Sequence, residues 1–131
     1  MSKQFPDLSP GEMAVTRGWI GDALIVTVHG EIDLITAPDL CSAVITALHD
    51  AGTKPCILDL TEVGFLGSAG LSALVKTAST AEHREQPLGI VVDSNRPVIR
   101  PLQVTGLDEV LALFHTVDEA LAVTAATPEK P

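Results

Sequence analysis

Ser68 is the residue of this sequence best suited to chemical modification. Its side chain is a small hydroxyl, and its neighbours Gly67 and Ala69 are too small to hide it. An apolar run over residues 56–60 precedes it and is typical of a buried strand, while Leu71 begins an apolar series at helical spacing. At the start of that helix, unpaired backbone N–H groups and the positive end of the helix dipole would surround the hydroxyl. The fold would therefore tolerate a negative group there, and Ser68 is predicted to be a switch.

Two other roles for Ser68 compete with a switch. The nucleophile elbow of a serine hydrolase has Gly two residues on either side of the serine, and here Gly70 fits whereas Leu66 does not. Hydrolysis also needs a base, and no spacing places one of the four histidines near Ser68. Those histidines are His29, His49, His83 and His115. The sequence disfavours hydrolysis, and the local sequence alone favours a plain helix N-cap.

The glycines around Ser68 do not match a known phosphate-binding loop. Residues 64–72 contain no lysine, which a P-loop requires, and Gly-x-Gly-x-x-Gly does not occur. We expect Gly64 and Gly70 to serve turn geometry and close packing of the helix on the sheet. The four histidines have no metal-ligand spacing. The sequence therefore predicts no cofactor, no metal site and no enzyme.

Two carboxylates lie close together in a second polar stretch. Residues 30–35 are predicted to form a turn that carries Glu31 and Asp33. The two side chains could act as an acid–base pair, or the turn could be solvated, with Asp33 capping backbone amides. The sequence leaves both interpretations open.

The composition indicates an acidic domain with an aliphatic core. The chain has 131 residues, 46% of them hydrophobic but only 3% aromatic, and a formal charge of −9. Nucleic-acid binding requires basic patches and is disfavoured. No apolar run approaches the ~20 residues of a membrane span, and residues 1–11 lack the apolar stretch of a signal peptide, so a cytoplasmic protein without membrane contact is expected. Cys41 and Cys56 are expected to be reduced, buried thiols.

Strand and helix patterns alternate along most of the chain. We expect a flexible lead-in over residues 1–12, one domain over 13–126 and a tail over 127–131. Strands are predicted at residues 13–20, 23–29, 56–60, 88–92 and 111–115. Helices are predicted from Thr36 to Gly52, at 68–83, from about 98 to Gly106, and from the capping box at 116–119 to about 126. Gly21 suits a type II′ hairpin turn, and Pro101 is expected to distort or break the third helix.

The element order β-β-α-β-α-β-α-β-α predicts an α/β fold. Its small mixed β-sheet has an antiparallel first hairpin, later strands joined by βα crossovers, and about four packed α-helices. Periodicity does not say whether the helices cover one face of the sheet or both.

Three ordered motifs resemble those of the STAS domain family, the bacterial anti-sigma-factor antagonists. Residues 28–34 resemble the family's Gly-Glu-(Ile/Leu)-Asp signature, residues 58–71 its phosphorylation loop, and residues 104–108 part of its C-terminal third. The resemblance covers about residues 13–122 with matching element order, and it implies a STAS-like fold.

The family resemblance also implies a function. The unphosphorylated protein binds a cognate anti-sigma factor with serine kinase activity and so frees a sigma factor. The kinase then phosphorylates the loop serine, which by motif position is Ser68, and releases itself; a serine phosphatase resets the switch. The partner-binding residues implied are Gly30, Glu31, Asp33, Gly67, Ser68, Ala69 and Gly70.

One residue departs from the family pattern. Members usually have Asp immediately before the serine, where this chain has Gly67. The kinase therefore lacks a carboxylate in the loop that it must grip. The alternative hypothesis is a non-switching STAS scaffold or ligand-sensing module, which binds its partner independently of phosphorylation.

Overall fold

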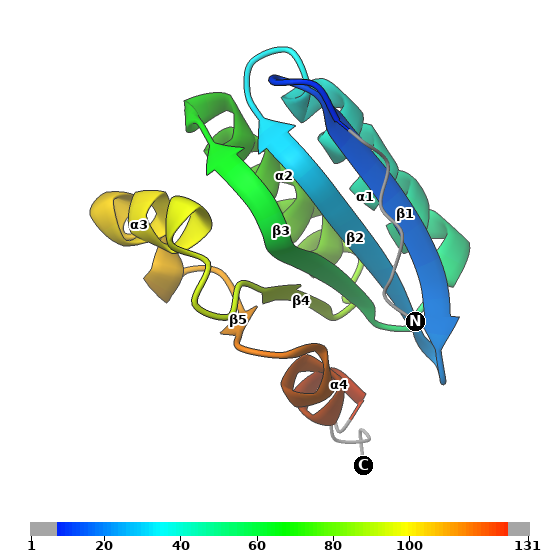
Figure 1. Ribbon diagram of the computed structural model, residues 1–131. Helices are drawn as coiled ribbons and strands as arrows, with labels where there is room; N and C mark the ends of the chain where they lie inside the picture. Colours follow the sequence, from blue (N-terminus) through cyan, green and yellow to red (C-terminus); the bar gives the residue numbers. More distant parts are fainter. Residues whose placement is uncertain (1–7, 126–131) are drawn as a thin grey trace, which may run out of the picture.

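The computed structural model describes residues 8–125, which form one mixed sheet flanked by helices (Figure 1). The strands are β1 (Met13–Ile20), β2 (Ala23–Ile32), β3 (Cys56–Leu66), β4 (Leu88–Val91) and β5 (Leu113–Phe114). The helices are α1 (Ala37–Ala51), α2 (Ser68–His83), α3 (Arg96–Thr105), α4 (Val117–Ala125) and the short 3-10 helix η1 (Leu107–Glu109). The predicted fold class is confirmed.

The strands lie in the order β1-β2-β3-β4-β5 across the sheet. β1 and β2 pair antiparallel, and every later pair is parallel. Gly21 has a φ of +58° at the first central position of the hairpin turn, as a type II′ turn requires. The parallel crossovers then bring the loops after β2 and β3 to the same end of the sheet.

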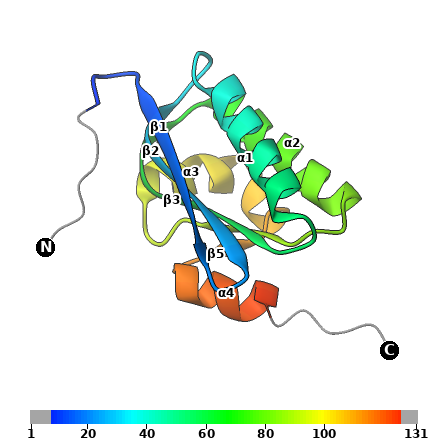
Figure 2. The same cartoon turned by 90° about the vertical axis from the view of Figure 1, so that its right-hand side faces the viewer.

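Helices cover both faces of the sheet, but unequally (Figure 2). The larger core cluster joins α1, α2 and α3 to one face, through residues such as Leu40, Leu74 and Leu102. The smaller cluster joins α4 to the other face, where Ala120 packs near Ile57. α2, the helix that begins with Ser68, therefore packs on the face of the sheet that carries three helices.

Two strands are longer than predicted, which corrects the placement of two turns. β2 continues through Gly30 to Ile32, and β3 continues through Gly64 to Leu66, so neither glycine lies in a turn. The pairing of these strands shifts register twice, and such bulges interrupt the alternation from which a strand is read. The Asn95 side chain supports the irregular part of β3 by donating to two of its carbonyls, those of Leu60 (2.9 Å) and Val63 (2.7 Å).

The later elements match their predictions with small changes. α3 continues through Pro101, so the prediction that this proline breaks the third helix is wrong. The proline deprives the helix of one backbone donor but does not end it. The last strand shortens to Leu113–Phe114. The predicted capping box is formed in a shifted version: the Glu119 N–H donates to the Thr116 hydroxyl (3.0 Å), but the Glu119 carboxylate accepts from the N–H of His115 (2.6 Å), one residue before the N-cap.

Both cysteines are free thiols, as predicted, although only one is fully buried. Burial raises the pKa of the Cys56 thiol to about 11, so this side chain stays protonated and unreactive at neutral pH. None of the helices within residues 8–125 is long and apolar enough to cross a membrane. The predicted tail, residues 127–131, and most of the predicted lead-in lie outside the described residues.

Candidate functional site

Ser68 is the first residue of α2, and its side chain is exposed. Gly67 is the N-cap residue and brings no side chain to the helix start. Two backbone hydrogen bonds fix this turn: the Gly67 N–H donates to Ile32 O of β2 (2.9 Å), and the Leu71 N–H donates to Gly67 O (3.0 Å). The hydroxyl of Ser68 is therefore presented on a fixed backbone at the positive end of α2.

Gly70 allows α2 to sit close to the sheet. It is buried, and a Cβ built on it would lie 2.6 Å from Leu66 Cδ1 and 2.7 Å from Ile32 Cγ2. The close packing predicted for Gly70 is thus present, whereas the same prediction for Gly64 is wrong, because a Cβ on Gly64 would meet nothing within 4 Å. Gly70 therefore sets how closely the first turn of α2 packs on the sheet.

Gly67 has an extended backbone that any residue can adopt, with φ −88° and ψ −178°. A Cβ built there would lie 3.1 Å from Cε2 of Phe65, so a side chain fits if the aromatic ring moves by a few tenths of an ångström. The backbone conformation at position 67 therefore does not require a glycine, and an aspartate could stand there.

Asp33 organises the loop between β2 and α1. One of its carboxylate oxygens, Oδ1, accepts from the N–H groups of Ile35 (2.9 Å) and Thr36 (3.0 Å). These bonds, the one from the Thr36 N–H first among them, hold the pKa of Asp33 below the ordinary value of an aspartate. The interpretation in which Asp33 caps backbone amides is confirmed. Thr36 occupies the N-cap position of α1, but its hydroxyl donates to Glu31 O (2.8 Å) instead of capping the helix.

Gly30 is covered by the N-terminal segment, which sequence reasoning missed. Its φ is +99°, and an added Cβ would collide with Glu12 O and lie 2.8 Å from Leu8 Cδ1. The next residue, Glu31, donates its N–H to the same Glu12 oxygen (2.9 Å). Gly30 is thus required by the chain crossing over it. Nothing in the local sequence of residues 8–12 signals this contact.

Three exposed apolar side chains lie at the end of the sheet where α2 begins, and we refer to them as the loop patch. Leu34 and Ile35 are 78% and 79% exposed in the loop after β2, and Phe65 is 48% exposed near the end of β3. The Phe65 ring borders Gly67, and the loop after β2 begins at Ile32, whose carbonyl binds Gly67. Exposed apolar residues grouped at one loop end indicate a protein-binding surface. The sequence carries a sign of this patch, because Leu34 and Ile35 are two aliphatic residues inside a predicted turn.

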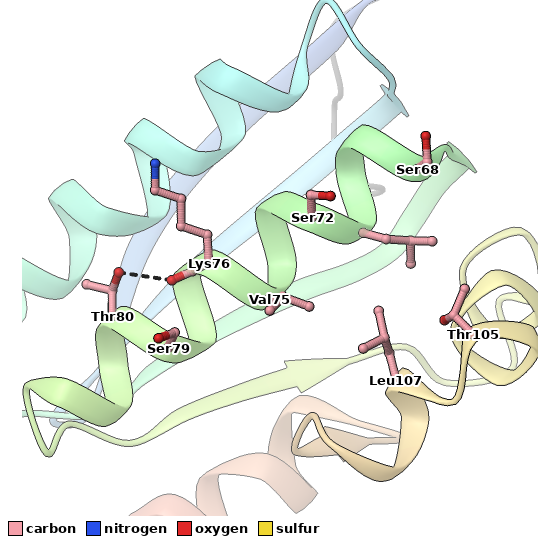
Figure 3. A pocket seen from close by; sticks show the side chains of 9 residues that line it. Ser68, Ser72, Val75, Lys76, Ser79, Thr80, Thr105 and Leu107 are labelled. Atoms are coloured by element: carbon pink, nitrogen blue, oxygen red, sulfur yellow. Dashed lines mark hydrogen bonds between the residues drawn. The ribbon is translucent and has the colours of Figure 1, made fainter.

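On its other side, Ser68 lines the end of a groove between α2 and η1 (Figure 3). The groove has a volume of about 640 Å³. Its lining residues are Ser68, Leu71, Ser72, Val75, Lys76, Ser79, Thr80, Thr105 and Leu107. Leu107 points from η1 toward α2, whereas the ammonium end of Lys76 points away from η1 (Figure 3). The floor of the α2–η1 groove is therefore apolar and its rim carries hydroxyl groups.

The structure does not assemble a hydrolase site around Ser68 from the described residues. His83 ends the helix that Ser68 begins, and His49 lies at that same far end, 3.4 Å from an Arg84 nitrogen. His29 is buried in β2 in register with Glu62, and His115 follows β5. Within residues 8–125, no group of three or more metal-ligating side chains is placed to hold an ion.

Known proteins resemble this chain over most of its length. The model of the STAS domain matches residues 15–120. The anti-sigma-F factor antagonist RsfB of Mycobacterium tuberculosis is 36% identical over 114 residues, which is 86% of this chain and 90% of the relative. An anti-sigma-B factor antagonist of Staphylococcus aureus is 31% identical over 86 residues, 66% of this chain and 78% of its own.

A solved structure agrees with these matches. The crystal structure of an anti-sigma factor antagonist from Mycobacterium paratuberculosis superposes with a TM-score of 0.81 at 32% identity. The superposition covers 89% of this chain and 97% of the other. The similarity thus extends over most of the length of both chains.

Proposed function

The chain belongs to the STAS domain family, and we propose that it is an anti-sigma-factor antagonist regulated at Ser68. On this proposal it is a cytoplasmic binding module and not an enzyme. Its partner is an anti-sigma factor with serine kinase activity, and binding frees a sigma factor. The exposed Ser68 hydroxyl at the start of α2, in a chain similar to named antagonists, is the observation that carries the proposal.

Phosphorylation of Ser68 would act on the complex and not on the fold. A phosphate adds roughly −1.5 to −2 charges at neutral pH. At the N-terminus of α2 this charge is favourable, by about 0.3–2 kcal/mol. Inside a packed interface the same group must lose its water, which costs several kcal/mol when it is left unpaired. A loss of about 4 kcal/mol in binding corresponds to roughly a thousandfold in affinity.

The surroundings of Ser68 fit a docking surface for a protein. The loop patch offers apolar area, and Glu31 and Glu62 add acidic groups on the neighbouring strands. Among the residues that the family resemblance implies, we assign direct contact to Ser68, Gly67, Ala69 and Glu31. Gly30, Asp33 and Gly70 are assigned an indirect role, because they shape the two loops from within.

The test is phosphorylation by an anti-sigma kinase of the source organism with ATP, followed by peptide mass mapping. We expect a single phosphate on Ser68, removable by a serine phosphatase. The Ser68→Ala variant should bind the kinase like the wild type, and Ser68→Asp should bind it far more weakly. A label at any other residue, or equal affinity of the two variants, would contradict the switch.

Gly67 supports the alternative of a module that does not switch. Without the usual carboxylate, the kinase has one less group to recognise. Such a scaffold, or a ligand sensor using the groove beside Ser68, would bind its partner equally with and without ATP. Binding measured before and after incubation with the kinase and ATP separates these two functions.

A further inference from the structure

The α2–η1 groove extends well beyond Ser68. A second hollow shares Val75 and Ser79 with it and continues along α2 toward Val110. From Ser68 to Ser79, α2 rises about 16 Å at 1.5 Å per residue. This length matches three turns of a helix lying against α2.

The chemistry of the groove suits an apolar surface of a partner. Leu71, Val75 and Leu107 form its apolar floor, and Val75 remains 39% exposed. Val104 and Val110, on either side of η1 in the sequence, are 75% and 72% exposed. The only charged lining residue of the first hollow is Lys76, whose ammonium end points away from η1 (Figure 3). An apolar segment can therefore enter without desolvating a charge.

The acidic residues beside the groove favour a partner segment with basic side chains along its edge. η1, which forms one wall of the groove, also carries Asp108 and Glu109. The whole chain has a formal charge of −9. Basic side chains flanking an apolar stripe would be attracted to this wall, and acidic ones repelled.

We propose that the α2–η1 groove receives an amphipathic helix of the anti-sigma factor, with an apolar stripe on the groove floor and basic residues facing Asp108 and Glu109. The inference rests on the proposed function, because it extends the surface that binds the same anti-sigma factor from Ser68 into the groove. Helix-in-groove binding uses apolar anchors at i, i+3 or i+4, and i+7, a spacing that three turns of α2 can accommodate.

This placement would let a modification of Ser68 control binding in the groove, because Ser68 lies at one end of it. The Ser68 side chain lines the same hollow as Leu71 and Thr105. The Ser68 hydroxyl lies at the end of the groove and, like the Lys76 ammonium, points away from η1 (Figure 3). A phosphate there would lie beside the end of a helix packed on Leu71 and not beneath it. Modification at one residue would thus weaken contacts along the whole groove.

The test compares two valines that are exposed on helices. The probe is the purified ATP-binding anti-sigma factor of the source organism that binds the wild-type chain most tightly, measured by calorimetry. We expect Val75→Glu in the groove to weaken binding at least tenfold. Val123→Glu on α4, where Val123 is 56% exposed, should leave the affinity unchanged. Circular dichroism and urea unfolding check that both variants are folded.

The outcomes separate this inference from the proposed function. If Val75→Glu binds like the wild type while Ser68→Asp loses binding, the groove inference is overturned and the proposed function stands. If Ser68→Asp also binds like the wild type, the switch itself fails. Equal losses in Val75→Glu and Val123→Glu overturn the inference as well. If ultracentrifugation shows a wild-type dimer that Val75→Glu dissociates, the occupant is a second copy of this chain instead.

A charge variant tests the orientation of the bound helix. Glu109→Lys should slow association with the same anti-sigma factor at least threefold at low salt, and added salt should reduce the difference. Glu85→Lys, an exposed change beyond the far end of α2, should slow it much less. Equal effects of the two variants would show that only the net charge matters, which contradicts a helix with basic residues at η1.

Discussion

The two ends of α2 are built in opposite ways. At the Ser68 end, one backbone hydrogen bond, from the Gly67 N–H to Ile32 O, and the close packing of Gly70 on Ile32 join the helix start to β2, and the three side chains of the loop patch lie exposed nearby. At the other end, the side chains of Arg84 and Gln86 bind the backbone of the segment that ends α1. One end is open to a partner, and the other is closed by contacts within the chain.

The closed end is a dense network of donors and carbonyls. Gln86, only 4% exposed, donates through Nε2 to Leu48 O (2.9 Å) and Lys54 O (2.8 Å). Arg84 donates to Leu48 O and Gly52 O (both 3.1 Å) and, through Nε, to Oε1 of Gln86 (2.8 Å). The comparison teaches that the side-chain network is confined to the far end of α2, so the fold can be weakened there without altering the exposed residues around Ser68.

Removing the buried amide of Gln86 should have the largest effect on stability. Gln86→Leu keeps the side-chain size but leaves the carbonyls of Leu48 and Lys54 with fewer donors in a buried place. Leu48 O keeps its bond from Arg84, so Lys54 O is the carbonyl that loses its side-chain donor. An unsatisfied buried group costs about 1–3 kcal/mol, so we expect the unfolding free energy to fall by about 2 kcal/mol in urea titrations. Gln86 is buried and only borders the second hollow of the groove, so the affinity of the folded protein for the anti-sigma factor should fall much less than its stability.

A control for the Gln86 variant is available on α3. Gln103 is exposed, so Gln103→Leu should leave the urea midpoint nearly unchanged. If Gln86→Leu reduced partner affinity as strongly as it reduced stability, the two ends of α2 would not be independent.

Crowding the Ser68 end should affect both stability and binding. Gly70→Ala places a methyl group 2.6 Å from Leu66 Cδ1, so α2 must shift on the sheet. Overpacking of this kind costs about 1–3 kcal/mol, partly offset by the better helix propensity of Ala. We expect a net loss of about 1 kcal/mol in unfolding free energy, with weaker binding because the helix start moves. Gly64→Ala, where the added methyl group meets nothing, should not weaken binding.

The sequence could predict the features that depend on local patterns, but not those that depend on contacts between distant parts of the chain. The strand–helix alternation, the position of Ser68 at a helix start and the packing role of Gly70 depend on local patterns, and they were predicted correctly. The extension of β3 through Gly64 was not, because two bulges interrupt its alternation and a side chain from outside the strand, Asn95, supports it. Likewise, residues 8–12 cross Gly30 through a contact between distant parts of the chain.

Adding a carboxylate at the open end should have a smaller effect, in the stabilising direction. Gly67→Asp supplies the missing N-cap acceptor of α2 and the negative charge that its positive end favours. Asp exceeds Gly at an N-cap by only a few tenths of a kcal/mol, the helix dipole adds a similar amount, and the Phe65 ring must move slightly, so we expect a gain of about 0.5 kcal/mol in unfolding free energy. Gly67→Ala adds the Cβ without the carboxylate and should show no gain.

The same variant restores the residue that the family usually has before the serine. We expect an anti-sigma kinase to phosphorylate Ser68 faster in Gly67→Asp than in the wild type, measured by initial rates of phosphate incorporation. Equal rates in wild type, Gly67→Ala and Gly67→Asp would show that the kinase does not use this position.

The smallest predicted effect is a pH dependence of the loop beside Ser68. Hydrogen bonds from the Thr36 and Ile35 N–H groups hold the pKa of Asp33 below 3.8 in the folded protein. A lowered folded pKa stabilises the protein above the unfolded pKa, and that contribution is lost as the pH falls through the folded value. The difference in unfolding free energy between wild type and Asp33→Asn should therefore be constant above about pH 5 and shrink below 3.8. Hydrogen bonds at short range cause this difference in unfolding free energy, so it should persist in 0.5 M salt. That is roughly five times the ionic strength at which the Debye length is ≈ 10 Å, so interactions between distant exposed charges would be screened. A difference that salt abolished would mean that Asp33 acts through long-range charge and does not fix the loop.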